Sequence, residues 1–120
     1  MASVVIIDDS DAIRMVLRDI IMIGKHVLAG ELNSGEKALE EYTKLKPDIV
    51  LLDMAMPKKD GITVLKEIMG FDKNAKIIMI SASDNQETVK ECMRLGAKEY
   101  ILKPFNFHEV LDKITQVVNL

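Results

Sequence analysis

The chain has 120 residues, 48% of them hydrophobic and 29% charged, and its formal net charge at pH 7 is −3. This balance is that of one ordinary globular domain, which we place at residues 1–120. A mildly acidic chain is poorly suited to nucleic acid, and no apolar run approaches the roughly 20 residues of a membrane span. Cys92 is the only cysteine, so an internal disulfide is excluded. We therefore expect a cytoplasmic, monomeric protein with neither nucleic acid nor a membrane as partner.

Five short apolar runs, taken in chain order, predict five β-strands. They lie at residues 4–7, 27–29, 49–52, 77–80 and 100–102. Four of these runs are apolar at every position, which is typical of strands that are covered by helices on both faces. The run at 27–29 is weaker and leads to Glu31, so we expect that strand at an edge of the sheet.

A longer segment with apolar residues at helical spacing follows each run, which predicts five helices. Four residues able to cap a helix N-terminus precede such segments: Ser10, Asn33, Asp84 and Asn106. The segment at 84–95 has the thinnest apolar stripe, so we expect it to be the least tightly packed helix. Strand and helix alternating five times predict an α/β fold with a parallel sheet and helices on both faces.

In an open parallel sheet, the residues that bind ligands lie just beyond the carboxyl ends of the strands. The residues at these predicted ends are Asp8 and Asp9, Asp53, Ser81 and Lys103. A single aspartate there is often only a turn or cap residue. Three carboxylates at one place repel one another unless a cation neutralises them. Oxygen donors without Cys or His suit a hard ion, so we predict a Mg²⁺ site.

The motifs around these residues resemble those of the receiver domains of two-component response regulators. They are Asp8-Asp9, Asp53 with Met56-Pro57 and Asp60-Gly61, Ser81-Ala82, and Lys103-Pro104. The resemblance extends over residues 4–118, with every motif in order, and is strongest to the single-domain chemotaxis regulators of the CheY type. It implies a doubly wound (βα)5 flavodoxin-like fold, a five-stranded parallel sheet in the order 2-1-3-4-5 with helices on both faces.

The resemblance also implies a role for each site residue. Asp53 would be the phosphoacceptor, taking its phosphoryl group from a phosphohistidine of a CheA-like histidine kinase. Asp9, Asp53 and the backbone carbonyl of Ala55 would ligate Mg²⁺, with assistance from Asp8, and Lys103 would supply a positive charge to the phosphoryl oxygens. Many CheY-type proteins have Asn at the position of Ala55, so any contribution of that amide to hydrolysis is missing here.

The same resemblance assigns the switch and its readout. Ser81 would turn toward the phosphoryl group and Tyr100 would then move from an exposed to a buried position, while Lys103–Pro104 would be a cis-proline peptide bond. The face made by residues 84–95, Tyr100 and residues 106–118 would bind a downstream protein, either a motor or an adaptor. A phosphatase would be a further partner.

The function expected from the sequence is therefore a phosphorylation-activated response regulator that controls chemotaxis or motility. It would be a signalling switch and not an enzyme, catalysing only its own phosphorylation and dephosphorylation. A phosphorelay intermediate or another stand-alone receiver is the alternative. A Mg²⁺-dependent phosphatase with an aspartate nucleophile is less favoured, because its general acid would occupy the position of Ala55. A flavodoxin-like flavin site is disfavoured too, because the acidic residues at 8–11 would repel a flavin phosphate.

Overall fold

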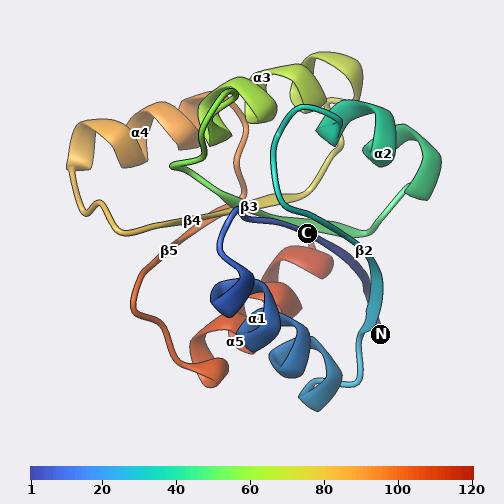
Figure 1. Ribbon diagram of the computed structural model, residues 1–120. Helices are drawn as coiled ribbons and strands as arrows, with labels where there is room; N and C mark the ends of the chain where they lie inside the picture. The colour runs from blue at the N-terminus through green and yellow to red at the C-terminus, as the bar shows by residue number, and fades with distance from the viewer.

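A computed structural model describes residues 1–120 and contains five strands and five helices in strict alternation (Figure 1). In chain order the elements are β1 (Ser3–Ile7), α1 (Asp11–Ile23), β2 (Val27–Leu32), α2 (Ala38–Leu45), β3 (Ile49–Asp53), α3 (Gly61–Phe71), β4 (Ile77–Ser81), α4 (Gln86–Arg94), β5 (Glu99–Leu102) and α5 (Phe107–Val118). The strands form one parallel sheet in the order β2-β1-β3-β4-β5. This arrangement confirms the predicted doubly wound fold and its strand order.

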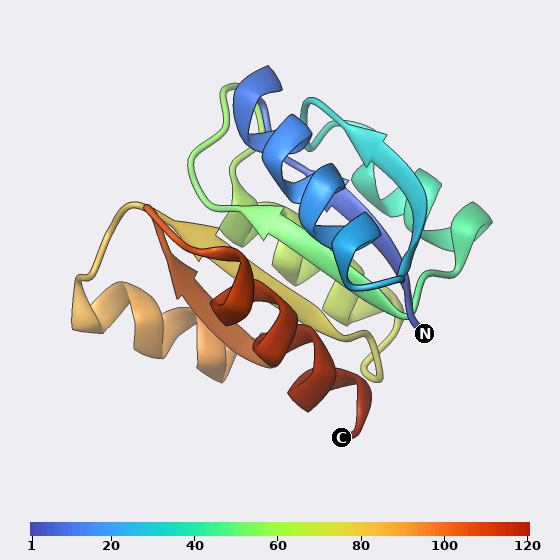
Figure 2. The same cartoon turned by 90° about the horizontal axis from the view of Figure 1, so that it is seen from below.

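The helices cover both faces of the sheet, with α1 and α5 on one side and α2, α3 and α4 on the other (Figures 1 and 2). Successive side chains of a strand point to opposite faces, so every strand contributes to two separate cores. In β3, for example, Val50 and Leu52 pack in the core under α2 to α4, while Ile49 and Leu51 pack in the core under α1 and α5. This is why the central strands are apolar at every position.

Two of the four predicted helix caps are correct and two are wrong. The Ser10 hydroxyl accepts from the Ile13 amide of α1, and the Asn106 side chain caps α5 in the same way. The cap of α4 is Asn85 and not its neighbour Asp84. Asn33 caps nothing, because α2 begins only at Ala38.

The loop between β2 and α2 explains the late start of α2. This loop packs against the β3–α3 loop, and a Cβ added at Gly35 would lie only 2.9 Å from the carbonyl oxygen of Lys59. Residues 33–37 are therefore used to cross that loop and cannot form the first turn of the helix. The side chain of Lys37, at the N-cap position of α2, forms no capping hydrogen bond.

The five helices differ in how many of their residues are buried. In α4 only Cys92 is buried, whereas α3 buries four of its residues, so the prediction of a loosely packed fourth helix is confirmed. The predicted edge position of β2 is confirmed too, and none of its residues is fully buried. None of the helices has the length and apolar character needed to cross a membrane.

Candidate functional site

The five polar residues predicted at the strand ends lie together at the carboxyl edge of the sheet. Asp53 is the last residue of β3 and Ser81 the last of β4, while Asp8 directly follows β1 and Lys103 directly follows β5. Carboxylate oxygens of Asp8, Asp9 and Asp53 all lie within 4.8 Å of one another. The fold therefore gathers three carboxylates, a hydroxyl and an ammonium from four neighbouring strands.

Two of the three carboxylates are buried with a single compensating charge. Asp8 is 1% exposed and Asp53 3% exposed. The ammonium Nζ of Lys103 lies 2.9 Å from Asp53 Oδ1 and 3.4 Å from Asp8 Oδ2. Burial raises the pKa of Asp53 and the negative charge of Asp8 raises it further, while the hydrogen bond from Lys103 acts in the opposite direction. Burial by itself would lower the pKa of Lys103, but its bonds to the two carboxylates outweigh burial and raise it.

The donor set fits a hard divalent cation. One ammonium faces three carboxylates, so two negative charges remain uncompensated when all of these groups are ionised. Asp9 is exposed and opens the cluster to solvent. The carbonyl oxygen of Ala55, in the loop after β3, accepts no hydrogen bond within the protein and is free to serve as a further oxygen donor. Residues with this charge and chemistry can hold Mg²⁺.

Ser81 and Tyr100 are connected through the main chain of one loop residue. The buried Oγ of Ser81 accepts from the amide of Ser83 at 3.0 Å, and the hydroxyl of Tyr100 donates to the carbonyl of Ser83 at 2.9 Å. The Lys103–Pro104 peptide bond is cis. Sequence reasoning missed Ser83, because both contacts use main-chain atoms that every residue has.

Gly61 packs directly against the backbone of the phosphoacceptor candidate Asp53. Its amide donates to the carbonyl of Met54 at 2.8 Å. A Cβ at this position would overlap the carbonyl oxygen of Asp53 and lie 2.8 Å from Met54 Cα. The preceding residue, Asp60, caps α3 by accepting from the Thr63 amide at 2.9 Å. The Asp60-Gly61 pair noted in the sequence thus begins α3 immediately beside Asp53.

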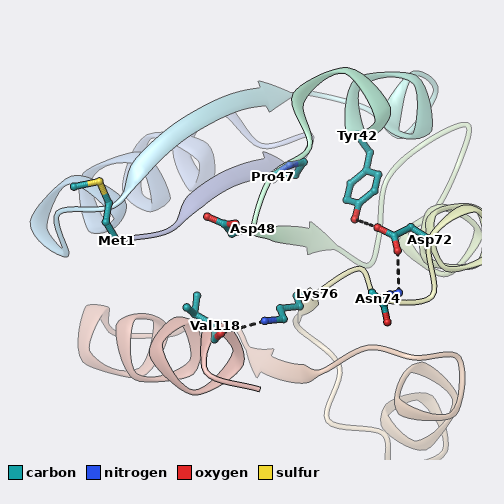
Figure 3. A pocket seen from close by; sticks show the side chains of 8 residues that line it. All are labelled: Met1, Tyr42, Pro47, Asp48, Asp72, Asn74, Lys76 and Val118. Carbon is teal, nitrogen blue, oxygen red and sulfur yellow. Dashed lines mark hydrogen bonds between the residues drawn. The ribbon is translucent and has the colours of Figure 1, made fainter.

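A cavity of about 360 Å³ lies at the amino ends of the strands (Figure 3). Both chain termini lie at this end of the sheet (Figure 2). The cavity is lined by Met1, Tyr42, Pro47, Asp48, Asp72, Asn74, Lys76 and Val118. Three of its polar side chains are already paired within the protein: Tyr42 donates to Asp72 at 2.8 Å, and Lys76 donates to the carbonyl of Val118 at 3.1 Å. Burial, followed by the contact with Asp72, raises the pKa of Tyr42. We therefore place the candidate site at the carboxyl edge.

Comparison with known proteins finds relatives that match nearly the whole chain. The family model for the response regulator receiver domain matches residues 4–115. The chain is 46% identical to the chemotaxis protein CheY of Thermotoga maritima, with 95% of each chain covered, and 40% identical to CheY of Bacillus subtilis, with 97% of each covered. It resembles the crystal structure of the CheX–CheY–BeF3–Mg²⁺ complex from Borrelia burgdorferi with a TM-score of 0.93 and 41% identity, over 96% of this chain and 87% of that chain.

Proposed function

Because the chain belongs to the response regulator receiver domain family, we propose that it accepts a phosphoryl group on Asp53 from a histidine kinase, in the presence of Mg²⁺. It is homologous to CheY-type regulators over nearly its full length and is a phosphorylation-activated signalling switch. The observation that carries the proposal is the position of Asp53 between two further carboxylates and the ammonium of Lys103.

In the proposed reaction the carboxylate of Asp53 attacks the phosphorus of a phosphohistidine. A bond forms between the carboxylate oxygen and phosphorus, the phosphorus–nitrogen bond breaks, and the electron pair leaves with the imidazole. Lys103 is already 2.9 Å from Asp53 and can follow the oxygens of the incoming group, which keeps positive charge beside them. Burial of Asp53 excludes water from the resulting acyl phosphate on the protein side.

Asp9, Asp53 and the Ala55 carbonyl are the proposed ligands of Mg²⁺, with Asp8 assisting. When bound, the ion neutralises charge on the transferring phosphoryl oxygens, which is the main requirement of such a transfer. Beryllofluoride and Mg²⁺ occur together in the Borrelia burgdorferi CheX–CheY complex, which supports a site of this type. We propose no role in hydrolysis for the Ala55 side chain, which is a methyl group.

The proposed switch runs from Ser81 through Ser83 to Tyr100. A phosphoryl group on Asp53 offers the Ser81 hydroxyl a charged acceptor, so Ser81 can turn and donate to the phosphoryl oxygens. This movement displaces the Oγ atom that now accepts from the Ser83 amide. The hydroxyl of Tyr100 donates to the carbonyl of Ser83, so a shift of the loop after β4 is transmitted to the tyrosine ring. The adjacent helix α4 has one buried side chain and can move with little disturbance of the core.

The face formed by α4, Tyr100 of β5 and α5 is the proposed binding surface for a downstream protein, a motor component or an adaptor. Each of the three elements contributes one exposed large apolar side chain, Met93, Leu102 and Phe107 respectively. Exposed apolar side chains mark a protein interface where they form one continuous patch, and the proposal requires these three to do so. The charged residues of α4, which are two Glu, one Lys and one Arg, would surround them with a polar rim.

Chemotaxis is the proposed pathway, because CheY proteins are prominent among the relatives. A phosphorelay intermediate is the alternative, in which the phosphoryl group passes from Asp53 to another protein. We further propose that residues 1–120 act as a single receiver domain, monomeric and cytoplasmic, and not as an enzyme on other substrates. The Borrelia burgdorferi complex pairs a CheY with CheX, and we propose that this chain also binds a second protein. A phosphatase that removes the phosphoryl group is a further proposed partner.

Mg²⁺ should stabilise the protein by binding the carboxylate cluster. At ten times its dissociation constant the ion should add about 1.4 kcal/mol, or roughly 5 °C in Tm. The Asp9→Asn variant should lose most of this increase, because Asp9 is the exposed carboxylate of the cluster. Thermal unfolding followed by circular dichroism, in Mg²⁺ and in EDTA, measures both effects. Asp84→Asn, which removes an exposed acid outside the cluster, is the control, and an equal Mg²⁺ effect in all three proteins would place the ion elsewhere.

Ser81→Ala should leave Asp53 able to accept a phosphoryl group, but the phosphoryl group should no longer change the conformation of α4 and Tyr100. With beryllofluoride as the phosphoryl mimic, amide NMR shifts in wild type should extend to α4 and Tyr100, and in the variant they should stay near Asp53. Ser83→Ala is the control, because Ser83 contacts both switch residues through its main chain. The variant loses only the bond that the Ser83 hydroxyl accepts from the Asn85 amide at 3.2 Å, and it should preserve the coupling. Equal responses of α4 in wild type and Ser81→Ala would contradict the proposed switch.

A further inference from the structure

The guanidinium of Arg14, the fourth residue of α1, folds back over the start of its own helix. Its Nη1 donates to the main-chain carbonyl oxygen of Asp8 at 2.7 Å, and its Nη2 pairs with Asp11. Its Nε lies 3.4 Å from Oε1 of Glu31 on β2. The side chain is only 14% exposed, so this arrangement is held within the protein rather than in solvent.

The carbonyl that Arg14 contacts lies at a point where the sheet no longer fixes the chain. Asp8 follows the last residue of β1, and its amide still donates to Leu32 at 3.1 Å. Its carboxylate has two anchors of its own, the Ser10 amide at 2.9 Å and Lys103. The carbonyl of Asp8, by contrast, accepts its hydrogen bond from Arg14.

The peptide group held in this way is the one that joins Asp8 to Asp9. The carboxylate of Asp9 is exposed and accepts no hydrogen bond within the protein, so no side-chain contact holds it, and where it can reach depends on where the main chain places its Cβ. We infer that Arg14 is a positioning residue for the cation: by holding the Asp8–Asp9 peptide it keeps the Asp9 backbone where the carboxylate can reach the position shared with Asp53. This inference rests on the Mg²⁺ site of the proposed function.

The loss of Arg14 has two effects on Mg²⁺ affinity, one through geometry and one through charge. They have opposite signs, so a measurement of the affinity shows which of them is larger. A positive charge near the cluster repels a cation, and its loss alone would tighten Mg²⁺ binding. The charge of Arg14 is already balanced by Asp11 and Glu31, however, so this electrostatic gain is small. Without the hydrogen bond from Arg14, the Asp8–Asp9 peptide and the Asp9 side chain become more mobile, which weakens Mg²⁺ binding. Groups that orient metal ligands typically contribute 10–100-fold to metal affinity.

The test compares Arg14→Gln with Arg18→Gln. Arg18 contacts the same Glu31, at 2.8 and 3.0 Å, but makes no contact with Asp8, so it is a matched control on the same helix. The Mg²⁺ dissociation constant is measured by amide NMR titration, and Tm is measured separately in EDTA. Arg14→Gln should raise the dissociation constant about tenfold, and Arg18→Gln should leave it unchanged.

Three results would overturn the inference: Mg²⁺ binding in Arg14→Gln as tight as in wild type, tighter binding, or an equal loss in Arg18→Gln. A lower Tm of Arg14→Gln in EDTA with an unchanged dissociation constant is the result of a purely structural role, and it counts against the inference too. Failure of the proposed site looks different, because wild type would then show no Mg²⁺ binding that depends on Asp9.

A second pair of variants, Arg14→Lys and Arg18→Lys, keeps every charge and serves if Arg14→Gln does not fold. An ammonium lacks the planar fork that reaches Asp8, Asp11 and Glu31 together. Arg14→Lys should therefore weaken Mg²⁺ binding while Arg18→Lys should not. Equal dissociation constants for these two variants would overturn the inference.

Discussion

The Asp53→Asn variant should take up no phosphoryl group from phosphoramidate or acetyl phosphate, under conditions in which wild type takes up one. An amide oxygen is a far weaker nucleophile than a carboxylate, and the substitution removes the attacking group without changing the size of the side chain. The amide oxygen can still accept from Lys103, so the surrounding structure should persist. Intact-protein mass spectrometry in the presence of Mg²⁺ measures the uptake directly.

The chemistry of the adduct provides the control for this experiment. The wild-type adduct should be released by hydroxylamine, because acyl phosphates react with it and serine phosphates do not. Asp84→Asn, with the same change at an exposed position in the loop after β4, should be phosphorylated like wild type. A stable phosphoryl group found on Ser81 or Ser83 would contradict the assignment of Asp53.

Gly61→Ala should both destabilise the protein and impair phosphorylation of Asp53. The added Cβ would overlap the carbonyl oxygen of Asp53 and approach Met54 Cα to 2.8 Å, and both are main-chain atoms that cannot rotate away. Overpacking of this kind typically costs about 1–3 kcal/mol, and we expect the upper part of that range here. The backbone shift that relieves the overlap must also displace Asp53 from Lys103, which should slow phosphoryl uptake.

Gly70 of the same helix provides a matched control. Outside the backbone of its own helix and its chain neighbours, no atom lies within 4 Å of a Cβ added there. Gly70→Ala should therefore raise stability by up to about 1 kcal/mol through helix propensity. Urea unfolding gives the free energies, and the rate of phosphorylation by phosphoramidate gives the effect on Asp53. Equal unfolding free energies for the two variants would show that the main chain near Asp53 adapts to the extra methyl group.

The fold could be predicted from the sequence because the central strands are apolar at every position, a pattern that strands buried on both faces require. Ile49 to Leu52 illustrates this, since alternate residues of the run enter two different cores. The positions of Asp8, Asp53, Ser81 and Lys103 followed from the same reasoning, because parallel strands end at one edge. Side chains that directly follow such strands meet there without further information.

The remaining features depend on contacts between segments that are distant in sequence. The late start of α2 results from packing of its preceding loop against Lys59, so the capping ability of Asn33 is not used. Ser83 contacts Ser81 and Tyr100 through its own main-chain amide and carbonyl. Arg14 donates to the main-chain carbonyl of Asp8. Contacts with main-chain atoms do not depend on residue type and so cannot be predicted from the sequence. Local sequence patterns report which face of an element is buried, but not which loop crosses it.

The sparse burial of α4 has a consequence for how new partnerships can arise. Only Cys92 of its nine residues is buried, so most of its other residues can be substituted with little effect on the stability of the fold. All five residues of β3 are buried, and the strand that carries Asp53 has no such freedom. A duplicated copy of this domain could therefore diverge toward a different target by changing α4 alone, while it inherits the same chemistry unchanged. The same property makes α4 the natural place to redesign specificity in an engineered signalling circuit.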